Sequence, residues 1–550
     1  MADLLLTLGH NASAIAISVK DGVAVVENAY ELERLSGVKS DSRFPLDAMI
    51  ALKERGVSNF ERVYVTHWDP MNNVDELKPK YWDRSVFPSH MPVYSQESLG
   101  LSHHDCHAYA AVAFAGDTFP KRDSGVLVID GFGNMSEHIS YYRLNQHGKP
   151  ELLTRLYGYS TSLGLMYQYA TSFLGMKMHE DEYKLLGYGS KIYEVDVLRG
   201  PIDDLALFEA TRLLKRMRSI DGRRLEVTLD VLPEVQEEWA NRFRSMLDRL
   251  GMQGIPSDSF EARVVIGYIV QRMLEITVQN LFMREIPIPT NLIITGGVAF
   301  NVELNRKLIT MMRGKVCAMP LAGDQGNSLG LWAFHNHRAR LDFGDLCWGR
   351  RNYEYEALPD GMQVFESDGP EVLAALSQAL DEVGFVNLVR GRMEFGPRAL
   401  CNTTTLALPT QEIAEEINRI NGRNSVMPFA PVVWHLAMPV TFQAAYKLHK
   451  SDAFMISALP YIPDVGQKVQ GAALFTPDKI FTGRPQSYKP KYENDSVGIL
   501  LQTKQQILIN TSFNVHGVPI CCDMKDVIHS HQFQHNLNPN VRTIVITDGA

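Results

Sequence analysis

The first forty residues predict three consecutive strands joined by turns. Residues 4–9 form an apolar run that ends at a glycine, and residues 13–20 alternate between apolar and small or polar side chains. Asp21-Gly22 is a two-residue turn signal typical of a hairpin, and a third apolar run follows it at residues 23–33. We therefore predict an antiparallel meander with a polar loop at its first turn.

Two later apolar runs also lead from a strand into a glycine-containing loop. Residues 124–130 run into the sequence DGFG, and residues 290–305 pass through a Gly-Gly turn into a helical pattern. Between them, residues 162–175 and 262–282 place apolar side chains at three- and four-residue spacing, which predicts helices. A meander followed by glycine-containing loops of this kind is typical of actin-like ATPase domains.

The pattern divides the chain into two α/β parts. Residues 197–258 are more charged and irregular than their surroundings, and we interpret them as a helical segment inserted into the first domain. The first domain is predicted to span residues 1–350, and a second α/β domain residues 369–550. The strands of the second domain should be short and mixed in direction; they are predicted at residues 384–389, 403–408, 506–513 and 542–547.

Composition places the chain among ordinary globular proteins. It has 550 residues, enough for about two to four domains, with 45% apolar and 21% charged residues. No run approaches the roughly 20 apolar residues that cross a bilayer, and the first residues lack a secretory pattern, so we expect a cytoplasmic protein without a membrane partner. A net charge of −9 makes nucleic-acid binding unexpected. The six cysteines show no paired spacing and should be reduced, buried thiols.

The motif His103-His104-Asp105-Cys106-His107 is the first candidate for chemistry. His103 and His107 are four residues apart, so on a helix they share one face and can bind one metal ion. Two imidazoles suit iron, zinc, copper or nickel, and added carboxylates favour iron. Asp130 and Asp324 lie in loops that end predicted strands and would complete a shell of two histidines and two aspartates. The sequence leaves open that the histidines are ordinary core or surface residues.

Three glycine-containing loops could bind phosphate groups. They span residues 9–13, 130–133 and 296–299, and each follows an apolar strand. Glycine lets backbone N–H groups approach phosphate oxygens closely, and such loops attract anions. A Gly-Gly pair after a strand is often only a turn, but three such loops in this order favour a nucleotide site. Lys184 could add a positive charge to that site or be a solvated lysine at a helix end.

Arginines in glycine- and proline-containing turns are the main feature of the second part of the chain. Residues 391–400 read GRMEFGPRAL, with an arginine on each side of a Gly-Pro turn, and Arg423 and Arg484 lie in further turns. Guanidinium groups suit planar recognition of phosphate or carboxylate. Gln486 and residues 510–514 add polar groups. This setting predicts an anion pocket rather than scattered surface charges.

Together these motifs give the chain a resemblance to a known family. It resembles the NodU/CmcH-type O-carbamoyltransferases, a group that includes tobramycin and nodulation-factor carbamoyltransferases. The matching segments cover nearly the whole chain in family order, and RMEFGPRAL with NTSFN is the most specific part. The segments are GHNASA, ELERLSGVKSDSRFP, HHDCHA, DGFG, SLGLMY, EDEYKLLG, GGVAFNVELN, GDQGNSLG, RGRMEFGPRAL, PFAPVV, GRPQSY and INTSFNVHGVPI.

The resemblance implies an enzyme of two domains. The N-terminal domain would be actin-like (ASKHA, threonylcarbamoyl-transferase-like), and the α/β domain that follows it would be YrdC-like. The YrdC-like domain would join carbamoyl phosphate and ATP into carbamoyl-adenylate, and the actin-like domain would transfer the carbamoyl group to a hydroxyl of a small acceptor near a bound metal. The implied ligands are ATP with Mg²⁺, a divalent metal (iron favoured, zinc as the alternative), carbamoyl phosphate and a hydroxylated acceptor; a homodimer is an open possibility.

The resemblance also implies roles for individual residues. The two histidines and two aspartates named above would be the metal ligands, and His10 would act at the transfer site as general base or orienting group. Arg398, Arg423 and Arg484 would contact carbamoyl phosphate or the adenylate. The nucleotide-binding residues would be Gly9, Asn11, Ser13, Gly131, Gly133, Lys184, Gly296, Gly297, Asn301 and Asn510.

A few positions depart from the family pattern. Cys401-Asn402-Thr403-Thr404 replaces an arginine-containing segment, Asn421 stands in place of a lysine, and Met427 stands in place of an arginine. Ser40 stands where a histidine is common. The lost cations would make the C-terminal pocket less positive, which suggests a divergent branch with its own acceptor.

The acceptor and two other function classes stay open at the level of sequence. The acceptor could be a natural product, a sugar or a hydroxymethyl-pyrimidine nucleotide. A tRNA threonylcarbamoyl-type transferase has the same fold but needs a basic RNA-facing surface, which the composition does not indicate. A non-catalytic actin-like ATPase regulator would leave the His/Asp set and the arginine pocket without a role.

Overall fold

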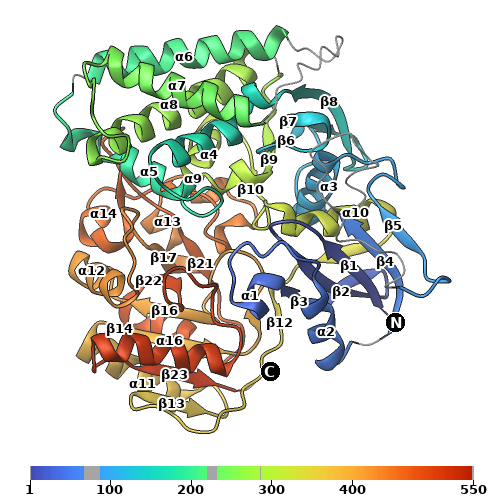
Figure 1. Cartoon of the computed structure of the whole chain (residues 1–550). Helices are drawn as coiled ribbons and strands as arrows, with labels where there is room; N and C mark the ends of the chain where they lie inside the picture. Colours follow the sequence, from blue (N-terminus) through green and yellow to red (C-terminus); the bar gives the residue numbers. More distant parts are fainter. Residues whose placement is uncertain are drawn as a thin grey trace.

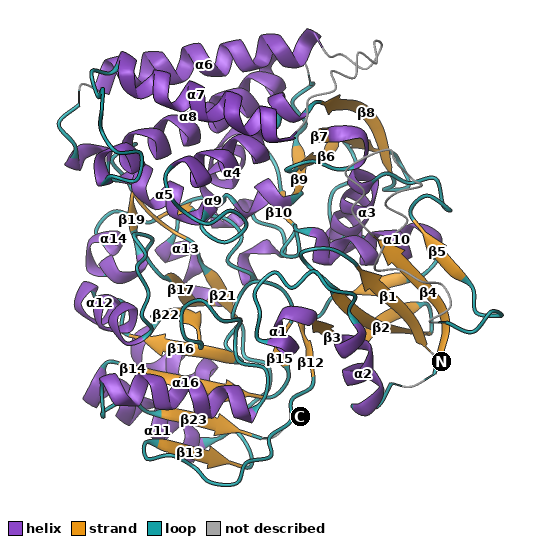
Figure 2. Cartoon of the chain, in the orientation of Figure 1, coloured by secondary structure: helices purple, strands orange, loops and turns teal. Residues whose placement is uncertain are grey.

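The computed structural model describes residues 2–57, 59–66, 87–197, 199–219, 232–284 and 286–547. Figure 1 shows two sheets in the first 350 residues, a layer of helices above them and a larger sheet formed by the C-terminal part. Figure 2 shows the same view by secondary structure, with the strands of the C-terminal sheet set apart from those near the N-terminus. The protein therefore has a mixed α/β fold.

The predicted opening meander is confirmed and forms the centre of a six-stranded sheet. β1 (Ala2–Thr7) pairs antiparallel with β2 (Ser13–Lys20), and β2 pairs antiparallel with β3 (Val23–Glu31). β4 (Phe60–Thr66) then pairs in parallel with β1, and β5 (Val93–Ser95) pairs in parallel with β4. The complete order is β11-β3-β2-β1-β4-β5, with β11 (Arg340–Asp342) at the edge beside β3.

The second sheet repeats the connectivity of the first. β6 (Ser124–Ile129), β7 (Glu137–Leu144) and β8 (Pro150–Tyr157) form an antiparallel meander. β9 (Asn291–Thr295) and β10 (Val316–Ala318) then add in parallel beside β6. The order β8-β7-β6-β9-β10 matches β3-β2-β1-β4-β5 strand for strand. The first 350 residues thus contain two topologically equivalent sheets.

Two helices lie between these sheets and contact each other. α3 (His103–Ala115) packs on β6 and β9 of the second sheet, and α10 (Asn327–His335) packs on β1 and β4 of the first. Gly330 of α10 lies against the Cys106 carbonyl of α3, where an added Cβ would be 1.8 Å from the carbonyl oxygen. The two helix backbones can approach this closely only because residue 330 has no side chain.

A layer of helices covers the second sheet. α4 (Leu163–Phe173) and α8 (Phe260–Arg284) confirm the two helices predicted from apolar spacing. The charged segment contains α6 (Arg199–Ser219) and α7 (Leu232–Arg249); α6 packs on α8, and α7 packs on α4. Within the described residues of the first 350, the other α-helices are α1 (Leu32–Ser36), α2 (Leu46–Glu54), α5 (Glu182–Ser190) and α9 (Val302–Met311).

The C-terminal part is built on a seven-stranded mixed sheet. Its order is β13-β23-β14-β16-β22-β17-β21, with parallel pairs toward both edges and antiparallel pairs in the centre. The four predicted strands are confirmed as β14 (Phe385–Arg390), β16 (Thr403–Ala407), β22 (Ile507–Ser512) and β23 (Thr543–Ile546). The other elements are β13 (Met362–Phe365), β17 (Ala430–Trp434), β18 (Leu459–Pro460), β19 (Leu474–Phe475), β20 (Phe481–Gly483), β21 (Gln486–Tyr488), α11 (Pro370–Val383), α12 (Gln411–Ile420), α13 (Met438–Thr441), α14 (Val465–Lys468), α15 (Ser496–Leu500) and α16 (Met524–Leu537).

A strand pair and a shared core join the two parts. β12 (Cys347–Gly349) pairs antiparallel with β15 (Met393–Glu394). One hydrophobic core extends from Leu5 and Ile129 in the first two sheets to Phe395 in the C-terminal part. All six cysteines are buried and free, as the sequence predicts. No helix within the described residues has both the length and the apolar character needed to cross a bilayer.

We expect Gly330→Ala to lower the free energy of unfolding by about 1–3 kcal/mol or to prevent folding, because its methyl group would overlap the Cys106 carbonyl. Gly200→Ala is the control: Gly200 is an exposed residue of α6 whose added Cβ would meet nothing within 4 Å. Chemical denaturation of both variants measures the difference. Wild-type stability of Gly330→Ala would contradict the close helix contact.

Candidate active site

Helix α3 directs two histidines to one point. Its N-terminus is fixed by Ser102, whose side chain accepts from the Asp105 N–H, while the Asp105 side chain accepts from the Ser102 N–H. His103 and His107, one turn apart, are both buried, and their Nε2 atoms lie 3.2 Å apart. The four-residue spacing therefore places both rings on one face of the helix, as predicted from the sequence.

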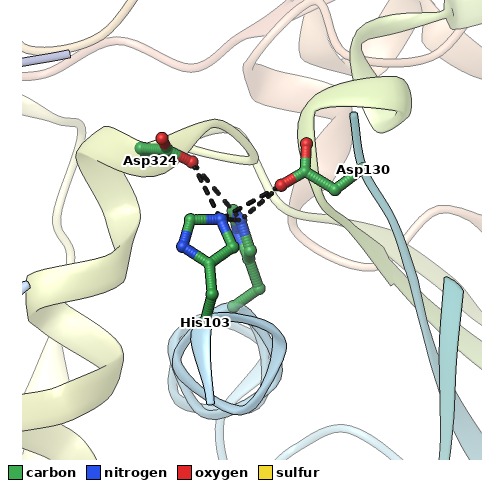
Figure 3. A group of neighbouring side chains, drawn as sticks. His103, Asp130 and Asp324 are labelled. Carbon is green, nitrogen blue, oxygen red and sulfur yellow. Dashed lines mark hydrogen bonds and ion pairs between the residues drawn. The ribbon is translucent and has the colours of Figure 1, made fainter. Parts of the chain in front are cut away.

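Asp130 and Asp324 face these rings from two different loops (Figure 3). Asp130 follows β6, and its Oδ1 accepts from the N–H groups of Gly131 at 2.8 Å and Gly297 at 3.0 Å. Its Oδ2 lies 3.1 and 3.3 Å from the two histidine Nε2 atoms. Asp324 lies just before α10, and its Oδ1 is 3.2 and 3.6 Å from the same two atoms. The four side chains thus converge from α3 and from two loops that follow β6 and β10 of the second sheet.

The four side chains fit a divalent metal ion. Their ligand atoms all lie within 4.8 Å of one another. Adjacent ligands bound about 2.0–2.2 Å from a common ion lie roughly 3.0–3.5 Å apart, close to the 3.1–3.6 Å contacts observed between histidine and aspartate. Burial disfavours charge on His103, yet the Asp324 and Asp130 carboxylates raise its pKa well above the ordinary value. A site that stabilises positive charge in this way is suited to a metal cation.

A buried polar network behind α3 holds this helix on the second sheet. His104 belongs to this network and not to the cluster: its Nδ1 lies 2.8 Å from Ser140 Oγ on β7. Its backbone N–H donates to Glu137, and Arg155 of β8 contacts both Ser140 and Glu137 at 3.0 Å. Burial lowers the pKa of His104 well below the ordinary value, so this histidine is neutral. The network fixes the helix whose other face carries the two cluster histidines.

One cavity of about 1390 Å³ connects the histidine–aspartate cluster with the C-terminal part. Asp130, Asp324 and His10 line it from the first 350 residues, and Arg398 and Arg484 line it from the C-terminal part. A molecule bound in this cavity can therefore contact both parts at once.

His10 lies on the cavity wall beside the cluster. Its side chain is 48% exposed, and its Nδ1 lies 3.9 Å from Asp324 Oδ2. A second imidazole, His179, lines the same cavity, with its ring centroid 5.5 Å from that of His10. His179 has a backbone φ of 66°, which non-glycine residues rarely adopt, and its N–H donates to Glu182 at 2.6 Å. Sequence reasoning missed His179 because it lies one residue before the matched segment EDEYKLLG, in a turn between α4 and α5.

Arg398, Arg423 and Arg484 form a group of cations without acidic partners. Within the part of the chain that the structure describes, no carboxylate pairs with any of the three. Burial, together with the neighbouring Arg423, lowers the pKa of Arg398 to about 10. Burial and both neighbours lower the pKa of Arg484 well below the ordinary value. Arg398 lies over the Phe300 ring and Arg423 over the Phe429 ring. Partly buried cations that repel one another are costly without an anion, so this group is suited to bind one.

The nucleotide-binding residues expected from the sequence separate into two groups. Lys184 is ion-paired with Asp181 at 2.7 Å, and the Asn510 amide donates to the Ala399 carbonyl at 2.8 Å, so both side chains already have partners. The residues that line the cavity are Gly9, Asn11, Gly131, Gly297 and Asn301, and those outside its lining are Ser13, Gly133, Lys184, Gly296 and Asn510.

The positions that depart from the family pattern also fall into two groups, one inside the C-terminal part and one at the cavity. Thr403 and Asn421 are buried and hydrogen-bonded within the C-terminal part. Ser40 and Met427 line the cavity. The neutral side chain of Met427 therefore stands at the cavity wall where a cation was expected.

Two family models match the chain. The model described as "Carbamoyltransferase N-terminus" matches residues 93–332, and the model described as "Carbamoyltransferase C-terminus" matches residues 377–545. Together they cover most of both parts, including α3, both aspartate loops and the three arginines.

Several known proteins are similar in sequence to this chain, some over most of their length and others over a part of it. "Uncharacterized protein MJ1051" of Methanocaldococcus jannaschii is 29% identical over 95% of this chain and 95% of its own length. "Nodulation protein NolNO" of Sinorhizobium fredii is 25% identical over 96% of this chain and 77% of its own. "3'-hydroxymethylcephem-O-carbamoyltransferase" of Streptomyces clavuligerus is 30% identical over 32% of this chain and 34% of its own.

Similarity to solved structures is weak. Component A of (R)-2-hydroxyglutaryl-CoA dehydratase from Acidaminococcus fermentans is 14% identical, covers 61% of this chain and 97% of its own, and has a TM-score of 0.33. Full-length HypF in its phosphate- and nucleotide-bound form is 16% identical, covers 61% of this chain and 55% of its own, and has a TM-score of 0.28. Scores this low do not establish a shared fold.

We expect the purified protein to contain about one equivalent of a transition metal and His107→Ala to lose most of it, because the ion would lose one of its four ligands. His104→Gln is the matched control, since His104 is the other buried histidine of α3 and its Nδ1 contacts Ser140. Inductively coupled plasma mass spectrometry measures the metal content of each variant. A full equivalent of metal in His107→Ala, or equal loss in both variants, would argue against the cluster as the site.

Proposed function

The chain belongs to the carbamoyltransferase family and is a transferase, and from this premise we propose that it is an ATP-dependent O-carbamoyltransferase. It converts carbamoyl phosphate and ATP to carbamoyl-adenylate and transfers the carbamoyl group to a hydroxyl of a small acceptor. The observation that carries this proposal is the cavity that joins Arg398 and Arg484 to the histidine–aspartate cluster.

Donor activation is assigned to residues 369–550, for which we propose a YrdC-like fold. Arg398 and Arg484 line the cavity without acidic partners, and their planar guanidinium groups suit the phosphate of the donor or the adenylate. In the net step, carbamoyl phosphate and water give carbamate and phosphate. The carbamate oxygen then attacks the α-phosphorus of ATP and displaces pyrophosphate. The arginines would stabilise the negative charge on the transferring groups.

Carbamoyl transfer is assigned to residues 1–350, for which we propose an actin-like fold. The strand-for-strand repeat of the two sheets supports this assignment, because an actin-like domain consists of two such halves. The acceptor oxygen attacks the carbamoyl carbon, the bond from this carbon to AMP breaks, and His10, which lines the cavity, would take the hydroxyl proton. A metal held by the two histidines and two aspartates, with iron favoured over zinc, would polarise the carbamoyl carbonyl.

The size of the cavity supports a route for the intermediate inside the protein. Its volume of about 1390 Å³ exceeds the roughly 300–1,000 Å³ of a typical small-ligand site. It therefore has room for a nucleotide and an acceptor together. A carbamoyl-adenylate that moves within one cavity would be less exposed to hydrolysis than one released into solvent. The proposed acceptors are a natural product, a sugar or a hydroxymethyl-pyrimidine nucleotide, each with a free hydroxyl.

We expect ATP to be converted to AMP only when carbamoyl phosphate is present. Arg398→Ala should lower this rate by at least about 100-fold, because the anion loses a buried charge-assisted contact. His103→Ala should leave carbamoyl-adenylate formation, measured as pyrophosphate release, within about two-fold of wild type, because the His103 ring contacts Asp130 and Asp324 rather than the arginines. Pyrophosphate and AMP release with and without carbamoyl phosphate are the measurements.

Arg419→Ala is the matched control for this assay. Arg419 is another arginine of the C-terminal part, but it is 52% exposed and paired with Glu416 on the surface of α12. It should keep wild-type activity. Turnover of ATP to ADP that does not depend on carbamoyl phosphate would refute the proposed function.

A further inference from the structure

The loop that carries Arg398 is held by two residues from the opposite part of the protein. Arg34, in the short helix α1 that follows the first meander, donates from Nη2 to the Gly396 carbonyl at 2.6 Å. The Gly396 N–H donates to Glu31 Oε2 at 3.1 Å, and the same carboxylate oxygen accepts from Arg34 Nε at 3.3 Å. Both backbone groups of Gly396 are therefore bound by one ion pair that lies more than 360 residues earlier in the sequence.

This ion pair is buried at the wall of the cavity. The Arg34 side chain is 1% exposed and the Glu31 side chain 8% exposed, and both residues line the cavity. Arg34 Nη1 is buried without a hydrogen-bond partner. Burial raises the pKa of Glu31, and the Arg34 cation opposes this shift. A buried ion pair contributes little net stability, so its geometry is a better guide to its role than its strength.

The position of Gly396 is further restricted by its backbone and its neighbours. It has a φ of +99°, in the region that favours glycine, and an added Cβ would lie 2.6 Å from Leu321 Cδ2. Leu321 lies three residues before Asp324 in the same loop. On the other side of the turn, Arg398 lies over the Phe300 ring, at the end of the Gly297–Phe300 turn. The tip of the arginine loop thus rests on the two loops that approach the metal cluster.

The base of this loop is held by its own part of the protein. The Glu394 carboxylate accepts from the N–H groups of Leu400, Asn402 and Thr403 at 2.8, 2.8 and 2.9 Å. Glu394 is fully buried, and Arg351 lies 3.8 Å from it. The base is therefore held by these bonds within the C-terminal part and by its pairing with β12, whereas the tip is bound by Glu31 and Arg34.

We propose that Glu31 and Arg34 form an interdomain latch that positions Arg398, so that the donor-binding group is complete only when the two parts are docked. The inference rests on the proposed function for the role of Arg398. Glu31 and Arg34 are positioning residues here: they act on the reaction through the Gly396 turn. A donor site assembled in this way would form carbamoyl-adenylate only when the transfer site is already in place beside it.

Two measurements on conservative variants test the latch. Arg34→Lys keeps the charge but cannot bind Gly396 and Glu31 at once, and Glu31→Gln keeps the shape but removes the charge. Both should raise the KM for carbamoyl phosphate by about ten-fold, while the KM for ATP changes by less than about two-fold. Hydrogen exchange of the Gly396 amide should become at least about ten-fold faster in both variants.

Arg55→Lys is the matched control. Arg55 also joins the two parts, because it binds Asp523 with two hydrogen bonds of 2.8 and 3.1 Å, but neither residue lines the cavity. It should leave the KM for carbamoyl phosphate and the exchange of Gly396 unchanged. Arg34→Lys and Arg55→Lys each replace an arginine by a lysine at a contact between the two parts. Comparing them therefore distinguishes an effect on the position of Arg398 from a general effect on the docking of the two parts.

The outcomes distinguish the latch from the proposed function. Equal effects of Arg34→Lys and Arg55→Lys, or unchanged exchange at Gly396 in Arg34→Lys and Glu31→Gln, would overturn the latch. Faster exchange at Gly396 with an unchanged KM for carbamoyl phosphate would also overturn it, because the turn would then move without affecting the donor site. If the wild-type protein forms no AMP from carbamoyl phosphate, the proposed function fails, and the exchange comparison alone decides whether the ion pair holds the turn.

Discussion

Helices α3 and α10 approach so closely that Gly330 has no room for a side chain beside the Cys106 carbonyl. The geometry of the cluster depends on this contact. Cys106 lies between His103 and His107 on α3, and Asp324 lies just before α10. The distance between the two helices therefore sets the distance between the histidines and one aspartate. Because each helix rests on a different sheet, the packing of the two halves also affects where Asp324 lies relative to the histidines.

The charges around the cavity are separated by sign. At one side, two carboxylates face two imidazoles and favour a bound cation. Elsewhere in its lining, burial and neighbouring cations lower the pKa values of Arg398 and Arg484, and these two arginines favour a bound anion. The two groups of charges line the same cavity of about 1390 Å³ but do not pair with each other. A substrate with a phosphate at one end and a carbonyl oxygen at the other would satisfy both groups. The reaction proposed for this enzyme uses a substrate of this kind.

The two parts of the protein are joined by polar contacts as well as by a shared core. β12 and β15 pair across the junction, and the core cluster runs from the first sheet into the C-terminal part. The Glu31–Arg34 pair and the Gly396 turn lie at the point where this junction meets the cavity. Packing gives the interface its stability, whereas directional hydrogen bonds determine where the arginine loop sits within it.

The sequence by itself determined the local elements and the residue types of the site. Apolar periodicity gave the meander at 4–33, the helices at 162–175 and 262–282 and the four C-terminal strands, because these patterns depend on residues a few positions apart. The resemblance to a known family named the two histidines, two aspartates and three arginines. Only the tertiary structure decided that Gly9 and Asn11 line the cavity whereas Lys184 and Asn510 do not, that His179 stands beside His10, and that Arg34 holds Gly396. These relations join residues that are distant in the chain, and they arise from the packing of whole elements, which no local pattern encodes.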